Sequence, residues 1–165
     1  MTRALPDRRT GPRDGVGRGP SADTARALRR VEPGRRRELV QFLARLGDAF
    51  AAGDLTAIAA CHVPPLLYVT EWGSAVFTST REVAEGFRQV VDDHRRRGLV
   101  SPTSVVETVS TPAARIVEIG VRWTFHDAEG RALLHDRYRY LLRRVDGEGL
   151  LINAVIVLGG RSVAP

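Results

Sequence analysis

The sequence predicts one small α+β domain at residues 35–160, in which three helices pack on a strongly bent, mostly antiparallel sheet. Before residue 99, three segments have the apolar spacing or the capping residues of helices, and two short apolar strands precede the third of them. After residue 100, four segments of alternating apolar and polar residues follow one another across short turns. Interleaved helices followed by a strand meander are typical of a sheet that helices cover on one face.

The first helix follows Pro33 and ends at Gly53, because glycine adopts the left-handed backbone that commonly closes a helix. Asp54 is expected to cap a short second helix at residues 55–61, and the prolines at 64–65 are expected to stop it. The first helix has apolar residues at positions i, i+3, i+4 and i+7, namely Leu39, Val40, Phe42, Leu43, Leu46, Ala49 and Phe50.

Short strands are predicted at residues 66–70 and 75–78, with a turn at Gly73 between them. Ser79 or Thr80 then caps the third helix. Three consecutive arginines at residues 95–97 complement the negative end of this helix, and we interpret them as solvated rather than as a binding patch. The core side of the helix is predicted to consist of Val83, Phe87, Val90 and Val91.

Four longer strands complete the predicted sheet, at residues 103–110, 115–126, 132–145 and 150–158. Pro112 is expected to separate the first two, and the turn-forming residues at 127–130 and 146–149 join the others as hairpins.

The excess positive charge is confined to the N-terminal tail. The whole chain of 165 residues carries a net charge of +6. Residues 1–37 hold eleven arginines and four acidic residues, whereas the rest holds fourteen arginines and fifteen acidic residues and is almost neutral. Residues 1–34 contain few large apolar groups, so we expect a disordered, solvated tail. Arginines there could contact nucleic acid phosphates, but no aromatic side chain is present to stack on bases.

Several functional classes are not supported by the sequence. The chain lacks an apolar run long enough to cross a membrane and a secretory signal, and Cys61 is its single cysteine, which favours a reducing cytoplasm. We interpret Cys61 as a small buried apolar residue. Metal-ligand spacings such as HxxH, a phosphate loop with lysine and a serine-hydrolase elbow are also absent, so no metal or cofactor is predicted.

The domain resembles the nuclear transport factor 2-like superfamily, in its SnoaL-like branch. The resemblance depends on the segment 50–55 that ends the first helix, the Gly73 turn, the helix at 80–98, the hairpin at 123–130, and the segment 138–144 with the strand at 147–152 that follows it. It implies a cone-shaped fold with an apolar pocket between the helices and the concave face of the sheet. The superfamily includes ketosteroid isomerase, scytalone dehydratase, polyketide cyclases and many non-catalytic binders, so the resemblance does not assign a reaction.

The residues of ketosteroid isomerases carry over only in part. When the chains are matched at Gly53, Leu46 stands where those enzymes have a catalytic tyrosine. Thr70, followed by Glu71, stands near the position of the general base. Asp136 matches the strand position of a protonated aspartate that stabilises an oxyanion, in an enzyme known for its tuned pKa values. Because only one of the three matches, steroid isomerisation is not predicted.

The strand at 132–145 carries the strongest candidate for chemistry. Asp136 alternates with Tyr138 and Tyr140, so the three side chains share one face. If this face lines the pocket, Asp136 is a buried carboxyl suited to acid or base catalysis, and the tyrosines can hold a ligand. The alternative is that Asp136 pairs with a neighbouring arginine, such as Arg122 on the adjacent strand, and that the tyrosines are half-buried core residues.

Further candidates come from other segments. His62 follows the second helix near the expected pocket mouth and can transfer a proton at neutral pH, or it can serve as a helix-end cation. Tyr68, Glu71 and Trp72 cluster at the first strand and its turn, where the tryptophan either walls a pocket or packs on the surface. Trp123 lies on the apolar face of its strand and is included among the ligand-binding candidates.

Two functions fit these observations. The first is a cofactor-free isomerase, cyclase or dehydratase acting on a small apolar, oxygenated molecule, with Asp136 and either His62 or Glu71 as acid and base. The second is a non-catalytic ligand-binding or dimerisation module. A homodimer through the sheet is expected by the resemblance, with a surface formed by Glu118, Arg122, Arg137 and Arg139.

Overall fold

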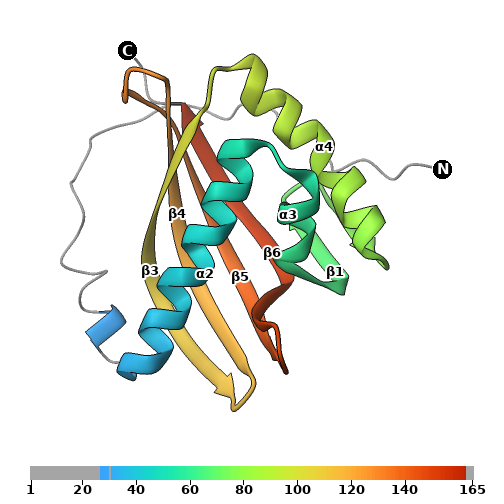
Figure 1. The fold of residues 1–165 in the computed structure, drawn as a ribbon, viewed down its shortest axis with the longest axis vertical. Helices are drawn as coiled ribbons and strands as arrows, with labels where there is room; N and C mark the ends of the chain where they lie inside the picture. The colour runs from blue at the N-terminus through green and yellow to red at the C-terminus, as the bar shows by residue number, and fades with distance from the viewer. Residues whose placement is uncertain (1–26, 30, 163–165) are drawn as a thin grey trace.

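In the computed structural model, helices α2, α3 and α4 lie on one side of a bent sheet (Figure 1). The structure describes residues 27–29 and 31–162. The disordered tail predicted at residues 1–34 therefore lies mostly outside the described residues. The α+β prediction is confirmed, and so is the order of the elements.

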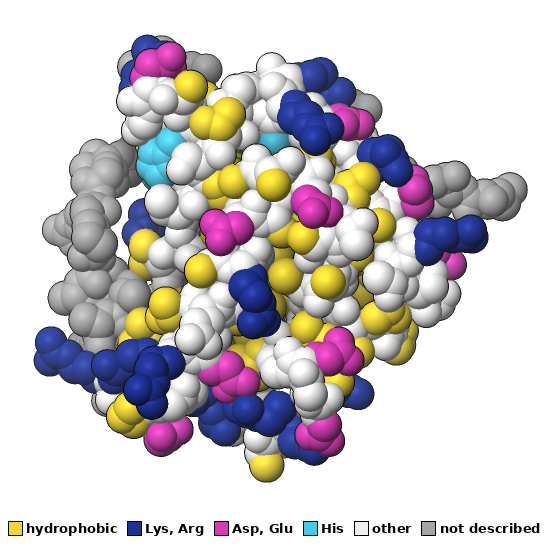
Figure 2. All heavy atoms as spheres, viewed as in Figure 1, with side chains coloured by type: hydrophobic (Ala, Val, Ile, Leu, Met, Phe, Trp, Pro, Cys, Tyr) yellow, Lys and Arg dark blue, Asp and Glu magenta, His cyan; other side chains and the backbone are white. Residues whose placement is uncertain are grey.

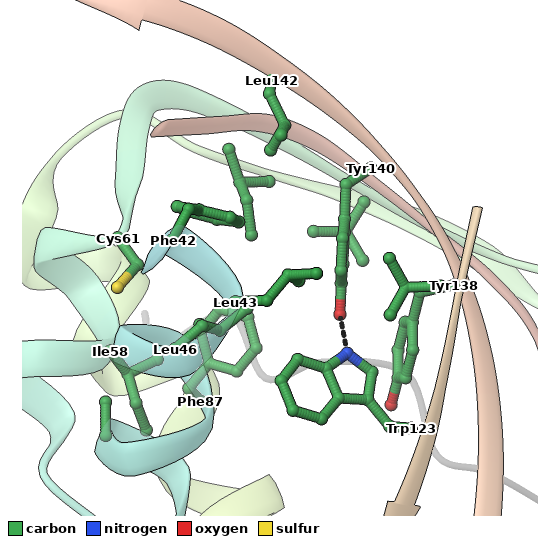
Figure 3. Packing of buried hydrophobic residues seen from close by; sticks show 14 of the residues in the cluster. Phe42, Leu43, Leu46, Ile58, Cys61, Phe87, Trp123, Tyr138, Tyr140 and Leu142 are labelled. Atoms are coloured by element: carbon green, nitrogen blue, oxygen red, sulfur yellow. Dashed lines mark hydrogen bonds between the residues drawn. The ribbon is translucent and has the colours of Figure 1, made fainter. Parts of the chain in front are cut away.

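Helix α2 (Pro33–Ala52) begins and ends close to the predicted positions. The Glu32 side chain accepts hydrogen bonds from Gly34 N and Arg35 N, which caps the first turn. At the other end, Gly53 has φ 62 and donates to the carbonyl groups of the last turn. Most of the predicted apolar side of the helix is buried against the sheet, as Phe42, Leu43 and Leu46 show in Figure 3. Val40 was predicted on this side but is 52 % exposed.

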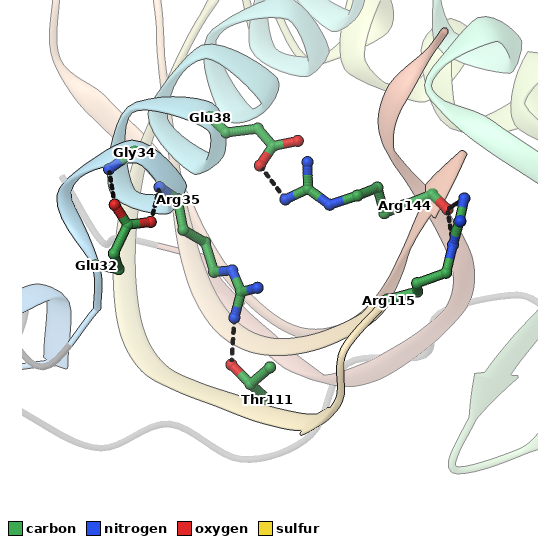
Figure 4. A network of polar contacts seen from close by, with 7 residues as sticks. All are labelled: Glu32, Gly34, Arg35, Glu38, Thr111, Arg115 and Arg144. Carbon is green, nitrogen blue, oxygen red and sulfur yellow. Dashed lines mark hydrogen bonds and ion pairs between the residues drawn. The ribbon is translucent and has the colours of Figure 1, made fainter. Parts of the chain in front are cut away.

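Polar contacts attach the start of α2 to the far ends of the long strands (Figure 4). Arg144 Nη2 donates to Glu38 Oε2 at 2.6 Å, and Arg35 Nη1 donates to Thr111 Oγ1 at 3.1 Å. Arg115 also donates to the backbone carbonyl of Arg144. These contacts fix the direction in which α2 crosses the sheet.

Helix α3 (Leu55–Ala60) and strand β1 (His62–Thr70) follow, and here the prediction was partly wrong. Asp54 caps α3 as expected and the helix ends within one residue of the predicted position, but the strand begins at His62 instead of residue 66. The prolines lie in the irregular first half of β1, where the register with β6 shifts. Proline has no N–H to donate to a neighbouring strand. The carbonyl groups of Val63 and Pro65 accept hydrogen bonds from the side chain of Asn153, through Nδ2.

Strand β2 (Gly73–Phe77) pairs with β1, and helix α4 (Thr80–Arg96) follows with Ser79 as its cap. The buried side of α4 includes Val83, Phe87, Val91 and also His94. The arginines at its end are exposed and pair with Asp92 and Asp93, which confirms that they form a solvated helix terminus.

The six strands form one mixed sheet in the order β2-β1-β6-β5-β4-β3. Strands β3 (Ser101–Ala113), β4 (Ile116–His126), β5 (Ala132–Val145) and β6 (Gly149–Ser162) form the predicted antiparallel meander. The β1–β6 pair is parallel. Pro112 does not separate two strands as predicted but lies near the end of β3, an edge strand where a missing N–H is tolerated.

Candidate functional site

A small cavity of about 30 Å³ lies between α2, α4 and the inner face of the sheet. This volume holds about one water molecule, so a larger guest requires side chains to move. None of the described residues that line it is an arginine, lysine, aspartate or glutamate. The lining consists of Leu46, Phe50, His62, Tyr68, Phe87, Val90, His94, Pro102, Trp123, Phe125, Tyr138, Tyr140, Ile152 and Val155.

Three lining residues mark the mouth of the cavity, because they are partly exposed while the others are buried. They are Phe50 at the end of α2, Val90 on α4 and Pro102 on β3. No two of them belong to the same element. Rotation of the Phe50 and Val90 side chains is therefore the simplest way to open the cavity.

Aromatic rings form most of the wall, and each ring contacts the next along it. His94 packs on Phe125 with ring centroids 4.6 Å apart and on Phe50 at 6.0 Å. Phe50 contacts Phe87 edge-on at 5.8 Å, and Phe87 contacts His62 at 5.0 Å. Such contacts stabilise the arrangement of the rings in an apolar wall.

His62 contributes a polar atom to this wall. The side chain is 5 % exposed, and its Nδ1 lies 2.7 Å from the carbonyl oxygen of Ile58 at the end of α3. Burial lowers the pKa of His62 from 6.5 to about 4, although the hydrogen bond to Ile58 acts in the opposite direction. His62 is therefore neutral at physiological pH and is not the helix-end cation that the sequence left open.

Two hydrogen bonds hold side chains in the part of the wall that strands β4 and β5 form. Tyr138 OH donates to Asp136 Oδ2 at 2.9 Å, and its ring stacks on Tyr140 with centroids 5.6 Å apart. Tyr140 OH accepts a hydrogen bond from Trp123 Nε1 at 3.0 Å, which Figure 3 shows. Gly47 lets α2 approach this wall, because a Cβ there would lie 3.2 Å from the Trp123 ring. The phenols and the indole are thus held in fixed positions.

Asp136 lies behind this wall and not on the cavity surface. It is 1 % exposed and is not among the lining residues, so the cavity reaches its carboxyl through Tyr138. The alternative pairing with Arg122 is wrong for a geometric reason. Asp136 stands opposite Trp123 in the β4–β5 register and faces inward, whereas Arg122 is on the outer face and pairs with Glu107 at 3.3 Å.

Five of the eight predicted site residues line the cavity, namely His62, Tyr68, Trp123, Tyr138 and Tyr140. The structure does not bring Glu71 and Trp72 to this site. Both are exposed in the tight turn between β1 and β2, and Trp72 is 52 % exposed. The turn lies at the edge of the sheet, so its side chains point away from the concave face.

The sequence analysis missed His94. It is buried, lines the cavity and contacts Phe50 and Phe125. Its position was predictable, because His94 follows Phe87 and Val91 by seven and three residues and so lies on the buried side of α4. The neighbouring arginines concealed this pattern.

Cys61 lies at the end of α3 and does not line the cavity. Cys61 is buried, and burial raises the pKa of its thiol, which agrees with an apolar role. In the described part of the chain, no three His, Cys, Asp or Glu residues are grouped as metal ligands. No described helix is both long and apolar enough to cross a membrane. Over the helix-covered face, charges of both signs are interspersed (Figure 2).

A bent sheet with helices on its concave face defines a cone-shaped α+β fold. Residues 37–158 match the family model described as NTF2-like protein (DUF6841). The chain belongs to this family, and the resemblance to the nuclear transport factor 2-like superfamily is confirmed. No curated protein matches the sequence.

Solved structures of low sequence identity share the fold. Aln2 from a Streptomyces species is 23% identical, with a TM-score of 0.60 over 76% of this chain and 91% of that one. A domain of unknown function with a cystatin-like fold from Nostoc punctiforme is 16% identical, with a TM-score of 0.60 over 77% of this chain and 78% of that one. A ketosteroid isomerase-like protein from Erwinia carotovora atroseptica is 15% identical, with a TM-score of 0.50 over 78% and 93% of the two chains.

Proposed function

We propose that this domain binds a small, uncharged, largely apolar molecule in the cavity between α2, α4 and the sheet. The observation that supports this function is the composition of the wall, which is aromatic and aliphatic with a few fixed polar groups and no acidic or basic residue other than histidine among those described. Ligand sites typically combine an apolar lining with a small number of oriented polar atoms. A charged ligand would lose its hydration without gaining a counter-ion.

Binding requires the cavity to widen, because about 30 Å³ does not admit an organic molecule. Phe50 and Val90 are partly exposed at the mouth, so their side chains can move into solvent, and Phe50 then gives up its ring contacts with Phe87 and His94. The apolar surface that a guest covers supplies about 25 cal/mol per Å² toward this rearrangement.

Tryptophan fluorescence provides the test. The chain has two tryptophans, so a Trp72→Phe variant leaves Trp123 in the cavity wall as the reporter. Toluene is expected to change the Trp123 emission saturably and to raise the melting temperature. A Val155→Phe variant, which fills the cavity, should lose this response, and Val76→Phe on the exposed outer face is the matched control. An unsaturable or unchanged signal would exclude binding in the cavity.

A second candidate, acid/base catalysis by an isomerase, cyclase or dehydratase, is favoured by one observation. The Tyr138–Asp136 hydrogen bond of 2.9 Å couples a carboxyl to a phenol on the wall of the cavity that His62 also lines. In this mechanism His62 is the base and Asp136 positions Tyr138. The Tyr138 proton is donated to Asp136, so the phenol oxygen holds the substrate by accepting from one of its hydroxyl groups. Glu71 has no role in this mechanism, because it lies on the surface. Tyr138→Phe should then abolish turnover while retaining binding.

We also propose that two copies pair through the outer face of the sheet, which α2, α3 and α4 leave uncovered (Figure 1). The predicted charged residues there are already paired within the chain, including Glu118 with Arg139 at 3.2 Å and Glu107 with Arg137 at 3.2 Å. The exposed apolar residues lie beside them, on β1, β2 and β6, and are Leu67, Val76, Ile156 and Leu158.

Light scattering tests this pairing. The wild-type protein is expected to be a dimer, and Ile156→Arg should be a folded monomer because it places a charge in the apolar part of the interface. A monomeric wild-type protein at the concentrations of the binding assays would remove the proposal.

A further inference from the structure

We propose that Nε2 of His62 accepts a hydrogen bond from the hydroxyl group of an uncharged, phenol-like ligand in the cavity. This inference rests on the proposed binding function and names the chemical class that the site selects. It depends on the orientation of one imidazole ring and on the groups that surround it.

The tautomer of His62 is fixed by its partner. A backbone carbonyl oxygen can only accept a hydrogen bond, so the contact of 2.7 Å between Nδ1 and Ile58 O requires a proton on Nδ1. In the neutral ring this leaves Nε2 with a lone pair and without a proton. The polar atom that His62 can offer to a guest is therefore an acceptor.

The acceptor is placed where a ligand can reach it. The His62 side chain is buried from bulk solvent, and it lines the cavity next to Phe87. Among the described residues, Ile58 provides the hydrogen bond of this ring, and no described donor is hydrogen-bonded to Nε2. A guest with an O–H group can donate a hydrogen bond to this nitrogen atom.

The other walls restrict the rest of the ligand. The rings of Phe50, Phe87, Phe125 and Trp123 surround the cavity and favour a planar aromatic guest. Carboxylates are disfavoured, because Nε2 without a proton cannot donate to them and no described lining residue is an arginine or lysine. The class that remains is a neutral aromatic molecule with a single hydroxyl donor.

A pair of probes of equal shape tests the inference in the full-length Trp72→Phe protein. Phenol and toluene differ in one group, a hydroxyl in place of a methyl, and both are followed by Trp123 emission and by calorimetry. Phenol is expected to bind about three- to tenfold more tightly, the contribution of one net hydrogen bond. A His62→Phe variant has an aromatic ring at this position but no ring nitrogen atoms, so this preference for phenol should disappear.

Binding of both probes with equal affinity, or a preference for toluene, would overturn the role of His62 and leave the cavity function intact. Binding of neither probe would overturn the cavity function itself. Because His62→Phe also removes the hydrogen bond to Ile58 and can unfold the protein, a second measurement uses the Trp72→Phe protein, in which His62 is unchanged. The nitrogen resonance of His62 Nε2 should shift on addition of phenol and not of toluene, and an unchanged resonance with bound phenol would contradict the inference.

Discussion

Protonation of His62 should make the stability of the domain depend on pH within a defined window. Its pKa is about 4 in the folded protein, against 6.5 for an exposed histidine, because the ring is buried. Between these two values the unfolded chain binds more protons than the folded one. The free energy of unfolding therefore falls as the pH falls from about 6.5 to about 4, and this loss is absent above the window.

The size of the effect follows from the same two values. Each pKa unit corresponds to about 1.4 kcal/mol, so the change from 6.5 to about 4 predicts a loss of about 3 kcal/mol across the window. Most domains of this size have a total stability of about 5–15 kcal/mol. The contribution of His62 should therefore be a large part of the acid sensitivity.

Urea unfolding at a series of pH values measures this contribution. A His62→Gln variant has no group that titrates at this position. Between about pH 6.5 and pH 4 its free energy of unfolding should therefore fall by about 3 kcal/mol less than that of the wild-type protein, whatever the stability of the variant at neutral pH. Val76→Gln, on the exposed outer face, changes no titratable group and is the control that should keep the wild-type slope. Equal slopes for wild type and His62→Gln would refute the reasoning that burial keeps the imidazole neutral.

Three further substitutions test the packing around the site, each by chemical denaturation. Gly86→Ala places a Cβ 2.5 Å from a ring carbon of buried Phe77, so it should cost about 1 kcal/mol or more, and Phe77→Leu should relieve that cost in the double variant. Tyr140→Phe removes the acceptor for Trp123 Nε1 and should cost about 1–3 kcal/mol; an unchanged stability would show that this hydrogen bond is not made. Asp54→Ala removes the cap of α3, where the carboxylate accepts from two backbone N–H groups, and should cost about 1 kcal/mol.

The sequence was sufficient for features that depend on neighbouring residues. Gly53 and Asp54 mark the boundary between α2 and α3 through local backbone and capping chemistry, so the end of one helix and the start of the next were predicted correctly. The alternation in β4 and β5 placed Trp123, Tyr138 and Tyr140 on the inner face, because strand residues alternate strictly between two faces.

Features that depend on distant residues were not predictable in the same way. The start of β1 was missed because its irregular half is held by Asn153, which is about ninety residues away in the chain. Glu71 was included in the site because it follows Thr70, which stands near the general-base position of ketosteroid isomerases. The orientation of Glu71 depends on where the β1–β2 hairpin lies in the sheet. The size of the cavity depends on how the aromatic side chains pack, which composition alone does not determine.

The most direct test of the cavity function is methyl NMR of the wild-type protein during a titration with toluene. Methyl groups that line the cavity, on Leu46, Ile152 and Val155, are expected to shift together and to saturate, whereas those of Leu67 and Val76 on the outer face should not move. Shifts confined to the outer face, or no saturable shift at all, would contradict the claim that this cavity is the binding site.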